Sequence, residues 1–155
     1  FYFSSKEELL VAVFEEFLSM HMERLRSAVA KESDPISKIR RLLTQGFQLM
    51  EDNPESAKIF LSQLRQSTEM IKMVAKRSSR AYLDIIESIL AEGVRNGACR
   101  EVDVHIAATM LFGGFQMVVY DWVASDRSYS LVGRADEVAR FVLEGIGCRP
   151  SSGQM

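Results

Sequence analysis

Residues 1–25 read FYFSSKEELLVAVFEEFLSMHMERL, and most of this stretch predicts one amphipathic helix. Ser5 and Glu8 have the spacing of a capping box, in which the serine hydroxyl accepts from the Glu8 amide and the Glu8 side chain reaches back. The positions that then recur every three or four residues are Leu9, Leu10, Val13, Phe14, Phe17, Leu18, His21 and Leu25. This spacing places them on one broad face, and we expect the helix to end near Lys31.

Five more helices are predicted from similar punctuation. Asp34-Pro35 and Asn53-Pro54 each place a capping side chain before a proline at the first helical position, where the missing amide costs nothing. They predict helices from residue 35 to about 50 and from 54 to about 65. The last three are expected over about 68–96, 104–124 and 131–146. No region alternates with period two, so the expected fold class is all-α, with a six-helix domain over 5–147 and a frayed tail over 148–155.

The overall composition fits one soluble domain that is not itself a nucleic-acid-binding module. The chain has 155 residues, 47% of them hydrophobic and 26% charged. Its 19 Lys and Arg residues are outnumbered by 21 Asp and Glu residues, which gives a net charge of −2. A domain that holds nucleic acid usually has a basic surface. If the intact protein binds DNA, most of the groups that do so lie outside this segment.

The cysteines and the acidic start of the chain predict a cytoplasmic protein. Cys99 and Cys148 are far apart in sequence, and we expect two unpaired thiols in a reducing compartment, with one disulfide as the alternative. Residues 1–17 contain acidic side chains where a secretory leader has none.

Residues 104–123, VHIAATMLFGGFQMVVYDWV, are long enough to span a bilayer. They include His105, Gln116 and Asp121 and have no basic flanks, so a buried core helix is the favoured interpretation over a membrane span. We therefore expect no membrane partner.

The same helix predicts a homodimer. A helix that is apolar all round must be covered all round, and one domain of this size has little left to cover it. Gly113 and Gly114 each cost about 1 kcal/mol against alanine in a helix, which the close approach of another backbone would explain. The expected interface, made by the last two helices of each subunit, is Phe112, Gly113, Phe115, Val119, Trp122, Val138, Phe141 and Val142. The alternative is a monomer in which this helix is simply central.

The opening residues, FYFSSKEELL, resemble a junction found in TetR-family transcriptional repressors. In that family the recognition helix of a helix-turn-helix ends in an aromatic run, followed by a polar turn, a lysine and a Glu-Leu-Leu-like helix start. The resemblance implies that residues 1–4 are a remnant of the DNA-binding head, with the helix-turn-helix absent from this chain. It also implies that Tyr2 and Lys6 contact operator DNA through backbone phosphates, which position a protein without reading sequence. The alternative is a half-buried Tyr2 and a solvated Lys6.

Four further motifs resemble the FadR-like branch of that family, the fatty-acid-degradation repressors that release DNA on binding long-chain acyl-CoA. They are Leu64-Arg65-Gln66-Ser67, Tyr82-Leu83-x-Ile85-Ile86, Glu92-Gly93-x-x-x-Gly97 and Asp121-Trp122-Val123. The resemblance implies that the effector is a fatty acyl-CoA or a similar long apolar molecule. An effector between the first and fourth helices would change the angle of the first helix and shift the population away from the DNA-bound state.

An unusual supply of aromatic and thioether side chains, including eight methionines, suits a pocket for a flexible alkyl chain. The predicted pocket residues are Phe14, Phe17, His21, Phe47, Met50, Phe60, Leu64, Arg65, Met73, Tyr82, Ile86, Met110 and Met117. Arg65 is expected to hold the thioester or a phosphate, because a guanidinium matches phosphate geometry. Four cations, Lys72, Lys76, Arg77 and Arg80, could attract the nucleotide end. The alternative is an ordinary core with a solvated helix face.

Enzyme and metal chemistry are not indicated. Neither His21 nor His105 stands in a Glu-x-x-His motif, which argues against a carboxylate-bridged dimetal bundle. No nucleophile elbow and no glycine-rich phosphate loop occurs. We expect no catalytic residue, no metal and no cofactor. A helical-bundle enzyme and a dimerisation module without a ligand remain as rival interpretations.

Overall fold

The computed structural model describes residues 2–62 and 69–148. Its helices are α1 (Lys6–Ala30), α2 (Pro35–Asp52), α3 (Pro54–Ser62), α4 (Glu69–Arg95), α5 (Val104–Ala124) and α6 (Ala135–Gly145), with one 3₁₀ turn (Val132–Arg134) before α6. The described residues contain no strand. The all-α fold class is confirmed.

Local side-chain caps fix the starts of three helices, α1, α2 and α5. The Ser5 hydroxyl accepts from the Glu8 amide at 3.1 Å, as the capping box predicts, while the Glu8 carboxylate accepts from the amide of Ser4 at 2.8 Å. Asp34 and Asp103 each accept from an amide three residues on, at 3.0 Å in both cases. Asn53 differs from the prediction, because its side-chain amide donates to the Leu49 carbonyl and so caps the end of α2.

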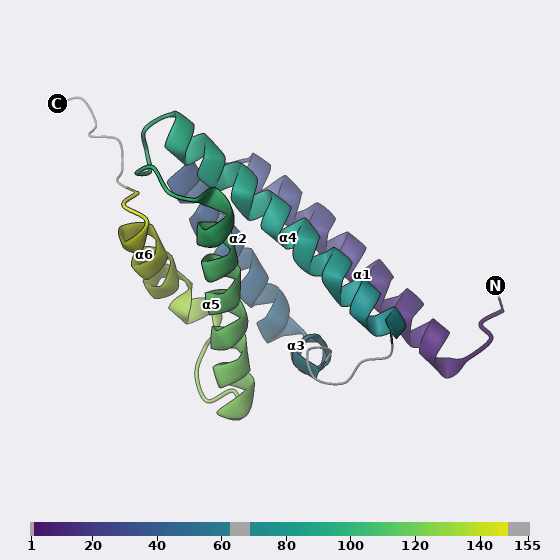
Figure 1. Cartoon of the computed structure of the whole chain (residues 1–155). Helices are drawn as coiled ribbons and strands as arrows, with labels where there is room; N and C mark the ends of the chain where they lie inside the picture. Colours follow the sequence, from purple (N-terminus) through teal and green to yellow (C-terminus); the bar gives the residue numbers. More distant parts are fainter. Residues whose placement is uncertain (1, 63–68, 149–155) are drawn as a thin grey trace.

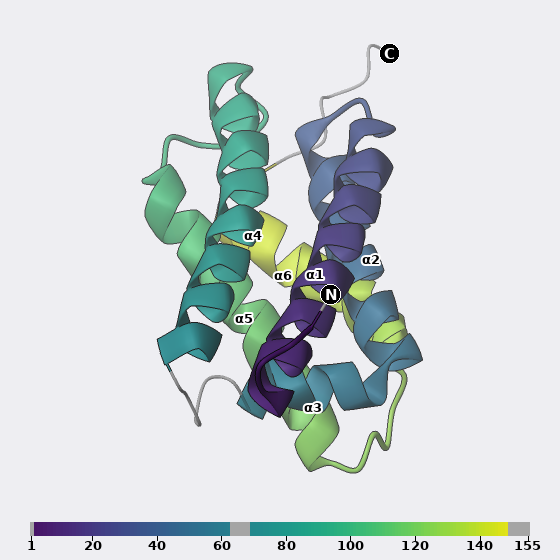
Figure 2. The same cartoon turned by 90° about the vertical axis from the view of Figure 1, so that its right-hand side faces the viewer.

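The longest helices lie side by side and set the shape of the bundle. In Figures 1 and 2, α1 and α4 run parallel, and cross-helix contacts agree, since Glu15 pairs with Arg77 and His21 with Tyr82. Helix α2 packs against α1, α4 and α6, while α5 packs against α4 and α3. The most deeply buried large side chains come from four of these helices and from the segment before the 3₁₀ turn: Leu25, Ile39, Leu42, Leu43, Phe47, Ile86, Leu90, Val119 and Leu131.

Helix α5 has one buried face and one exposed face. Among the described helices it alone is long and apolar enough to cross a membrane by those two criteria. Seven of its residues are nonetheless buried in the helical core: Ala107, Ala108, Leu111, Phe112, Phe115, Val119 and Trp122. The opposite stripe is open, with Ile106, Met110 and Met117 respectively 53%, 72% and 61% exposed. Added Cβ atoms at Gly113 and Gly114 would meet nothing within 4 Å.

This arrangement corrects the predicted dimer face. Phe112, Phe115, Val119 and Trp122 are buried within their own subunit, so they are not available to a second chain. Polar residues are sparse on this helix, and the exposed His105 and Asp121 mark its outer stripe only weakly, so the predicted interface fell on the inner stripe. Of the remaining predicted interface residues, Gly113 and Phe141 are exposed, and Val138 and Val142 are partly buried.

The structure also corrects the prediction that the two cysteines are unpaired thiols. Cys99 and Cys148 form a disulfide across 49 residues of sequence, and both are buried. Each follows the end of a helix, and each backbone amide bonds back to that helix: Cys99 to the Gly93 carbonyl at 2.9 Å and Cys148 to the Leu143 carbonyl at 2.8 Å. Because the ends of α4 and α6 meet in the fold, sequence distance was a poor guide to pairing. Cys148 is therefore not part of a frayed tail.

Candidate functional site

A groove of about 380 Å³ runs along the seam between α1 and α4. Its apolar lining comes from Leu18, Met22, Val74 and Ala81. Charged side chains border it: Glu15, Glu23, Arg26 and Arg77. The groove therefore combines an apolar floor with ionic edges, which suits a ligand with an apolar body and a charged end. It lies where we predict the effector to bind.

A second groove, of about 650 Å³, lies on the α2 side of α1, and its lining residues are almost all of polar or charged types. It is lined by Glu23, Arg24, Ser27, Ala28, Lys31, Glu32, Arg41 and Gln45. Arg41 is paired with Glu32 at 2.8 Å. Glu23 borders both grooves, so the polar groove adjoins the apolar one across α1. No pattern in the sequence indicated this polar groove.

One buried polar pair joins α1 to α4 beside the apolar groove. His21 Nε2 lies 3.1 Å from the Tyr82 hydroxyl, within hydrogen-bond distance. Burial, with a smaller contribution from the nearby charge of Arg24, lowers the pKa of His21 to about 4. Burial also raises the pKa of Tyr82. Both side chains are therefore neutral near pH 7, which is the form that a low-dielectric interior favours.

Aromatic rings surround the tyrosine end of this pair. The Tyr82 ring stacks on Phe112 with centroids 5.3 Å apart, and Phe47 stacks on Phe115 at 4.9 Å. Gly46 allows this packing, since an added Cβ would come within 2.9 Å of the Phe115 ring and 3.1 Å of the Tyr82 hydroxyl. The four rings bring α2, α4 and α5 together directly behind the α1–α4 seam.

The predicted pocket residues separate into an inner and an outer group. Those in the interior are Phe14, His21, Phe47, Met50, Tyr82 and Ile86, with Phe17 half-buried. The prediction was wrong for three methionines, Met73, Met110 and Met117, because they are at least 60% exposed and do not line the interior. The two α5 methionines lie on its open stripe. Leu64 and Arg65 lie outside the described residues, as does the side chain of Phe60.

None of the described residues that line the groove was among the predicted pocket residues, although Arg77 was one of the cations expected to attract a nucleotide. Met22 and Leu18 line the groove but were not among the predicted pocket residues. The signal was present, because Met22 is four residues after Leu18 and three before Leu25, on the face that the helical period marks. Arg26, at the edge of the groove, had no such signal, since a charged residue on an exposed helix surface is ordinary.

Most of the cations predicted to attract a nucleotide are paired with carboxylates. Lys72 bonds to Glu69 at 2.8 Å, and Arg77 bonds to Glu15 at 3.2 Å across the groove. Exposed pairs of this kind contribute about 0–1 kcal/mol, so an anionic ligand could displace the carboxylate at little cost.

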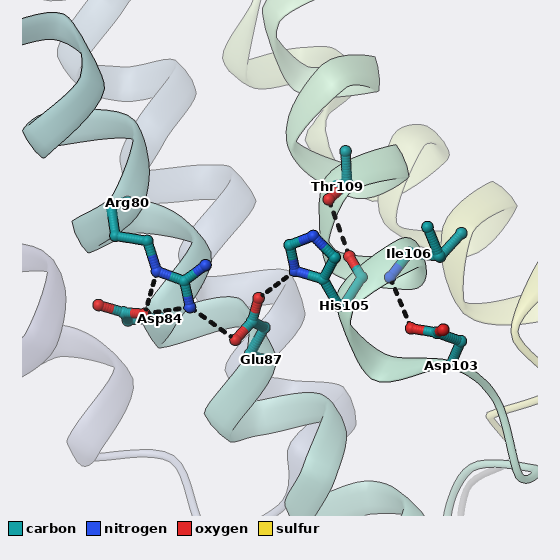
Figure 3. A network of polar contacts seen from close by, with 7 residues as sticks. All are labelled: Arg80, Asp84, Glu87, Asp103, His105, Ile106 and Thr109. Atoms are coloured by element: carbon teal, nitrogen blue, oxygen red, sulfur yellow. Dashed lines mark hydrogen bonds and ion pairs between the residues drawn. The ribbon is translucent and has the colours of Figure 1, made fainter.

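Figure 3 shows how Arg80 is held in a network that links α4 to α5. Its guanidinium bonds to Asp84 at 2.6 Å and to Glu87 at 2.9 Å. Glu87 also contacts His105 Nδ1 at 2.7 Å, and the histidine hydrogen bond is the main reason that the pKa of Glu87 is lowered. This network stands on the α5 side of α4 and is a structural link between helices, not part of the groove.

The structure places the two predicted DNA-contacting residues at the free end of α1. Tyr2 is fully exposed and Lys6 is exposed in the first turn. Their contact with DNA stays a prediction. The described residues contain no group of three or more His, Cys, Asp or Glu side chains that could hold a metal ion.

A six-helix bundle with a groove along its first helix belongs to the class of helical ligand-binding domains. Residues 14–145 match the TetR C-terminal family model described as "YsiA-like protein, C-terminal region". This match spans most of the chain, so the chain belongs to the TetR family, as its C-terminal domain.

Relatives place the chain near regulators of fatty acid metabolism. It is 29% identical over 146 residues to the fatty acid metabolism regulator protein of Bacillus subtilis (strain 168), covering 94% of this chain and 75% of the relative. The solved structure of FadR from Bacillus subtilis in complex with stearoyl-CoA has a TM-score of 0.86 and 29% identity, over 94% of this chain and 78% of that one. The fatty acid degradation regulator FadR from Bacillus halodurans also gives 0.86, with 28% identity over 96% and 77%. These relatives are transcriptional regulators and not enzymes, and the resemblance to the FadR-like branch is confirmed.

Proposed function

We propose that this chain is the effector-binding and dimerisation domain of a cytoplasmic TetR-type repressor whose effector is a long-chain fatty acyl-CoA. The observation that carries the proposal is the similarity to a FadR that is solved with stearoyl-CoA, with a TM-score of 0.86 over 94% of this chain. The groove between α1 and α4 supports it, because an acyl-CoA needs an apolar site and an ionic site side by side.

The two parts of an acyl-CoA fit the two kinds of lining. Each buried methylene of the acyl chain contributes about 0.8 kcal/mol, so contact with Leu18, Met22 and Val74 favours a long chain. Arg26 and Arg77 at the edge can meet phosphates, for which a guanidinium is well shaped. Arg24 and Lys31 in the adjoining polar groove extend the cationic surface for the nucleotide.

The position of the groove connects binding to DNA release. An effector that separates α1 from α4 changes the angle of α1, whose first residues are joined to the DNA-binding head in the family. Two heads that no longer match half-sites about 34 Å apart lose the operator. The effector must bind the tilted state more tightly than the DNA-bound state, since equal affinity would shift nothing.

Dimerisation is proposed through the exposed stripe of α5 together with the exposed side of α6. Met110, Met117 and Phe141 are 72%, 61% and 81% exposed, which is unusual for such large apolar side chains. Gly113 and Gly114, with open space beside them, let a second helix approach closely. The four-helix interface predicted from the sequence is kept, with the outer stripe of α5 in place of the inner one.

Isothermal titration calorimetry of the chain with lauroyl-, palmitoyl- and stearoyl-CoA tests the proposal. We expect saturable binding that tightens with chain length, and a rise in melting temperature with each ligand. Coenzyme A alone and free palmitate are the controls for the head and the tail, and each should bind more weakly than the thioester. No heat and no thermal shift with any of the three thioesters would remove the acyl-CoA assignment.

A further inference from the structure

His21 and Tyr82 form a polar pair inside an otherwise apolar region. They are 6% and 7% exposed, and their nitrogen and oxygen lie 3.1 Å apart. Apart from tyrosine, His21 is the one polar or charged side chain buried to this degree in the part of the chain that the structure describes. Burying polar groups is costly, and an apolar residue at either position would pack without that cost. The pair is therefore expected to serve something other than packing.

The pair holds one more donor hydrogen than it uses. A neutral histidine carries one N–H and a tyrosine one O–H, and the contact between Nε2 and the hydroxyl consumes one of these two hydrogens. If Nε2–H donates, the Tyr82 hydrogen has no acceptor among the described residues. If Tyr82 donates, the hydrogen on His21 Nδ1 has none. In either tautomer a buried donor is left without an acceptor in the part of the chain that the structure describes, which is uncommon in folded proteins.

This pair lies one residue along α1 and one along α4 from side chains that line the groove. Met22 and Ala81, which line the α1–α4 groove, are the chain neighbours of His21 and Tyr82. On its other side the Tyr82 ring stacks on Phe112 in the aromatic cluster. In the proposed pose the phosphates meet Arg26 and Arg77 at the groove edge, and the alkyl chain lies on its apolar lining. The carbonyl group then lies between the two, on the seam of α1 and α4.

We propose that the Tyr82 hydroxyl, oriented by His21 Nε2–H, donates a hydrogen bond to the thioester carbonyl oxygen of the effector. The chain of bonds then runs from His21 Nε2–H to the Tyr82 oxygen and from the Tyr82 hydrogen to the ligand, so both donors are used. This inference rests on the proposed function and adds to it a preference for acyl thioesters. A carboxylate is disfavoured because it would bring a charge into apolar surroundings.

The test compares two ligands that differ only at the carbonyl. Palmitoyl-CoA and S-hexadecyl-CoA have the same chain length, but the second is a thioether with a methylene in place of the carbonyl. We expect the wild-type chain to bind the thioester about tenfold more tightly, which corresponds to one hydrogen bond. Tyr82→Phe should bring this ratio close to one, through weaker binding of the thioester alone. Tyr129→Phe is the matched control, because Tyr129 bonds to Asp121, away from the groove, and the ratio should stay near ten.

The outcomes separate this inference from the proposed function. If wild type binds both ligands equally well, the carbonyl contact does not exist, while acyl-CoA binding stands. An unchanged ratio in Tyr82→Phe also overturns the inference. Binding of neither ligand overturns the proposed function and this inference with it. The wild-type ratio needs no variant, so the test holds even if Tyr82→Phe fails to fold.

Discussion

Protonation of His21 should destabilise the fold in mildly acidic solution. Its pKa falls from 6.5 to about 4 on folding, chiefly because it is buried. Below pH 6.5 His21 is protonated in the unfolded chain but stays neutral in the folded chain, so the free energy of unfolding falls as the pH drops. It levels off below about pH 4, where His21 is protonated in both states. The whole loss is about 3 kcal/mol, of which about 2 kcal/mol appears between pH 7 and pH 5.

Denaturant unfolding followed by circular dichroism measures this loss, with His21→Gln as the reference. Glutamine stays neutral and can still bond to Tyr82, so the difference between the two proteins reports the titration of residue 21. Acidic groups such as Glu8, Asp34 and Glu87, whose pKa values are lowered by hydrogen bonds, titrate in both proteins and cancel. The wild-type advantage over His21→Gln should shrink by about 2 kcal/mol between pH 7 and pH 5. Parallel curves would show that His21 is equally easy to protonate in both states and would refute the buried, neutral assignment.

Three further predictions concern packing at Gly46, the dimer interface and the disulfide. Gly46→Ala should lower the free energy of unfolding by about 1–3 kcal/mol in denaturant titrations, because its methyl group would meet the Phe115 ring at 2.9 Å; an unchanged value would mean that the ring moves freely. Phe141→Asp, at an 81% exposed position, should convert a dimer to a monomer in light scattering while circular dichroism stays unchanged; a dimer of undiminished affinity would place the interface elsewhere. Reduction of the Cys99–Cys148 bond, which closes 49 residues, should destabilise the fold by about 4 kcal/mol, measured with and without reductant; equal stabilities would show that the bond does not form in solution.

The helices could be predicted because their signals are local. Ser5, Asp34 and Asp103 cap helices that begin at the next residue, and each cap acts over three residues. Asn53 shows the limit of this reasoning, since the same residue type can cap the helix before it or the one after it. Its donation to Leu49 depends on the bend between α2 and α3, which no short pattern encodes.

The site could be predicted only in part, because faces are set by packing partners. His21 and Tyr82 were identified from their helix positions, but their contact joins residues 61 apart. Met110 and Met117 were assigned inward because polar residues are sparse on α5, and the positions of α4 and α3 decide which side is covered. The pairing of Cys99 with Cys148 likewise depends on where α4 and α6 end.

The parallel course of α1 and α4 has a consequence for how the domain deforms. Parallel neighbours cannot be joined by a tight turn, so the chain passes through α2 and α3 before it returns, and the seam contacts span 61 and 62 residues. Contacts this distant in sequence carry a large closure entropy and, in a folding pathway, form after local ones. Helix α4 also contacts α5 and α2, so its packing does not depend on α1 alone. A ligand that loosens this seam would therefore leave the packing of α4 on α5 and α2 in place, so that α1 could move while the rest of the bundle keeps its arrangement.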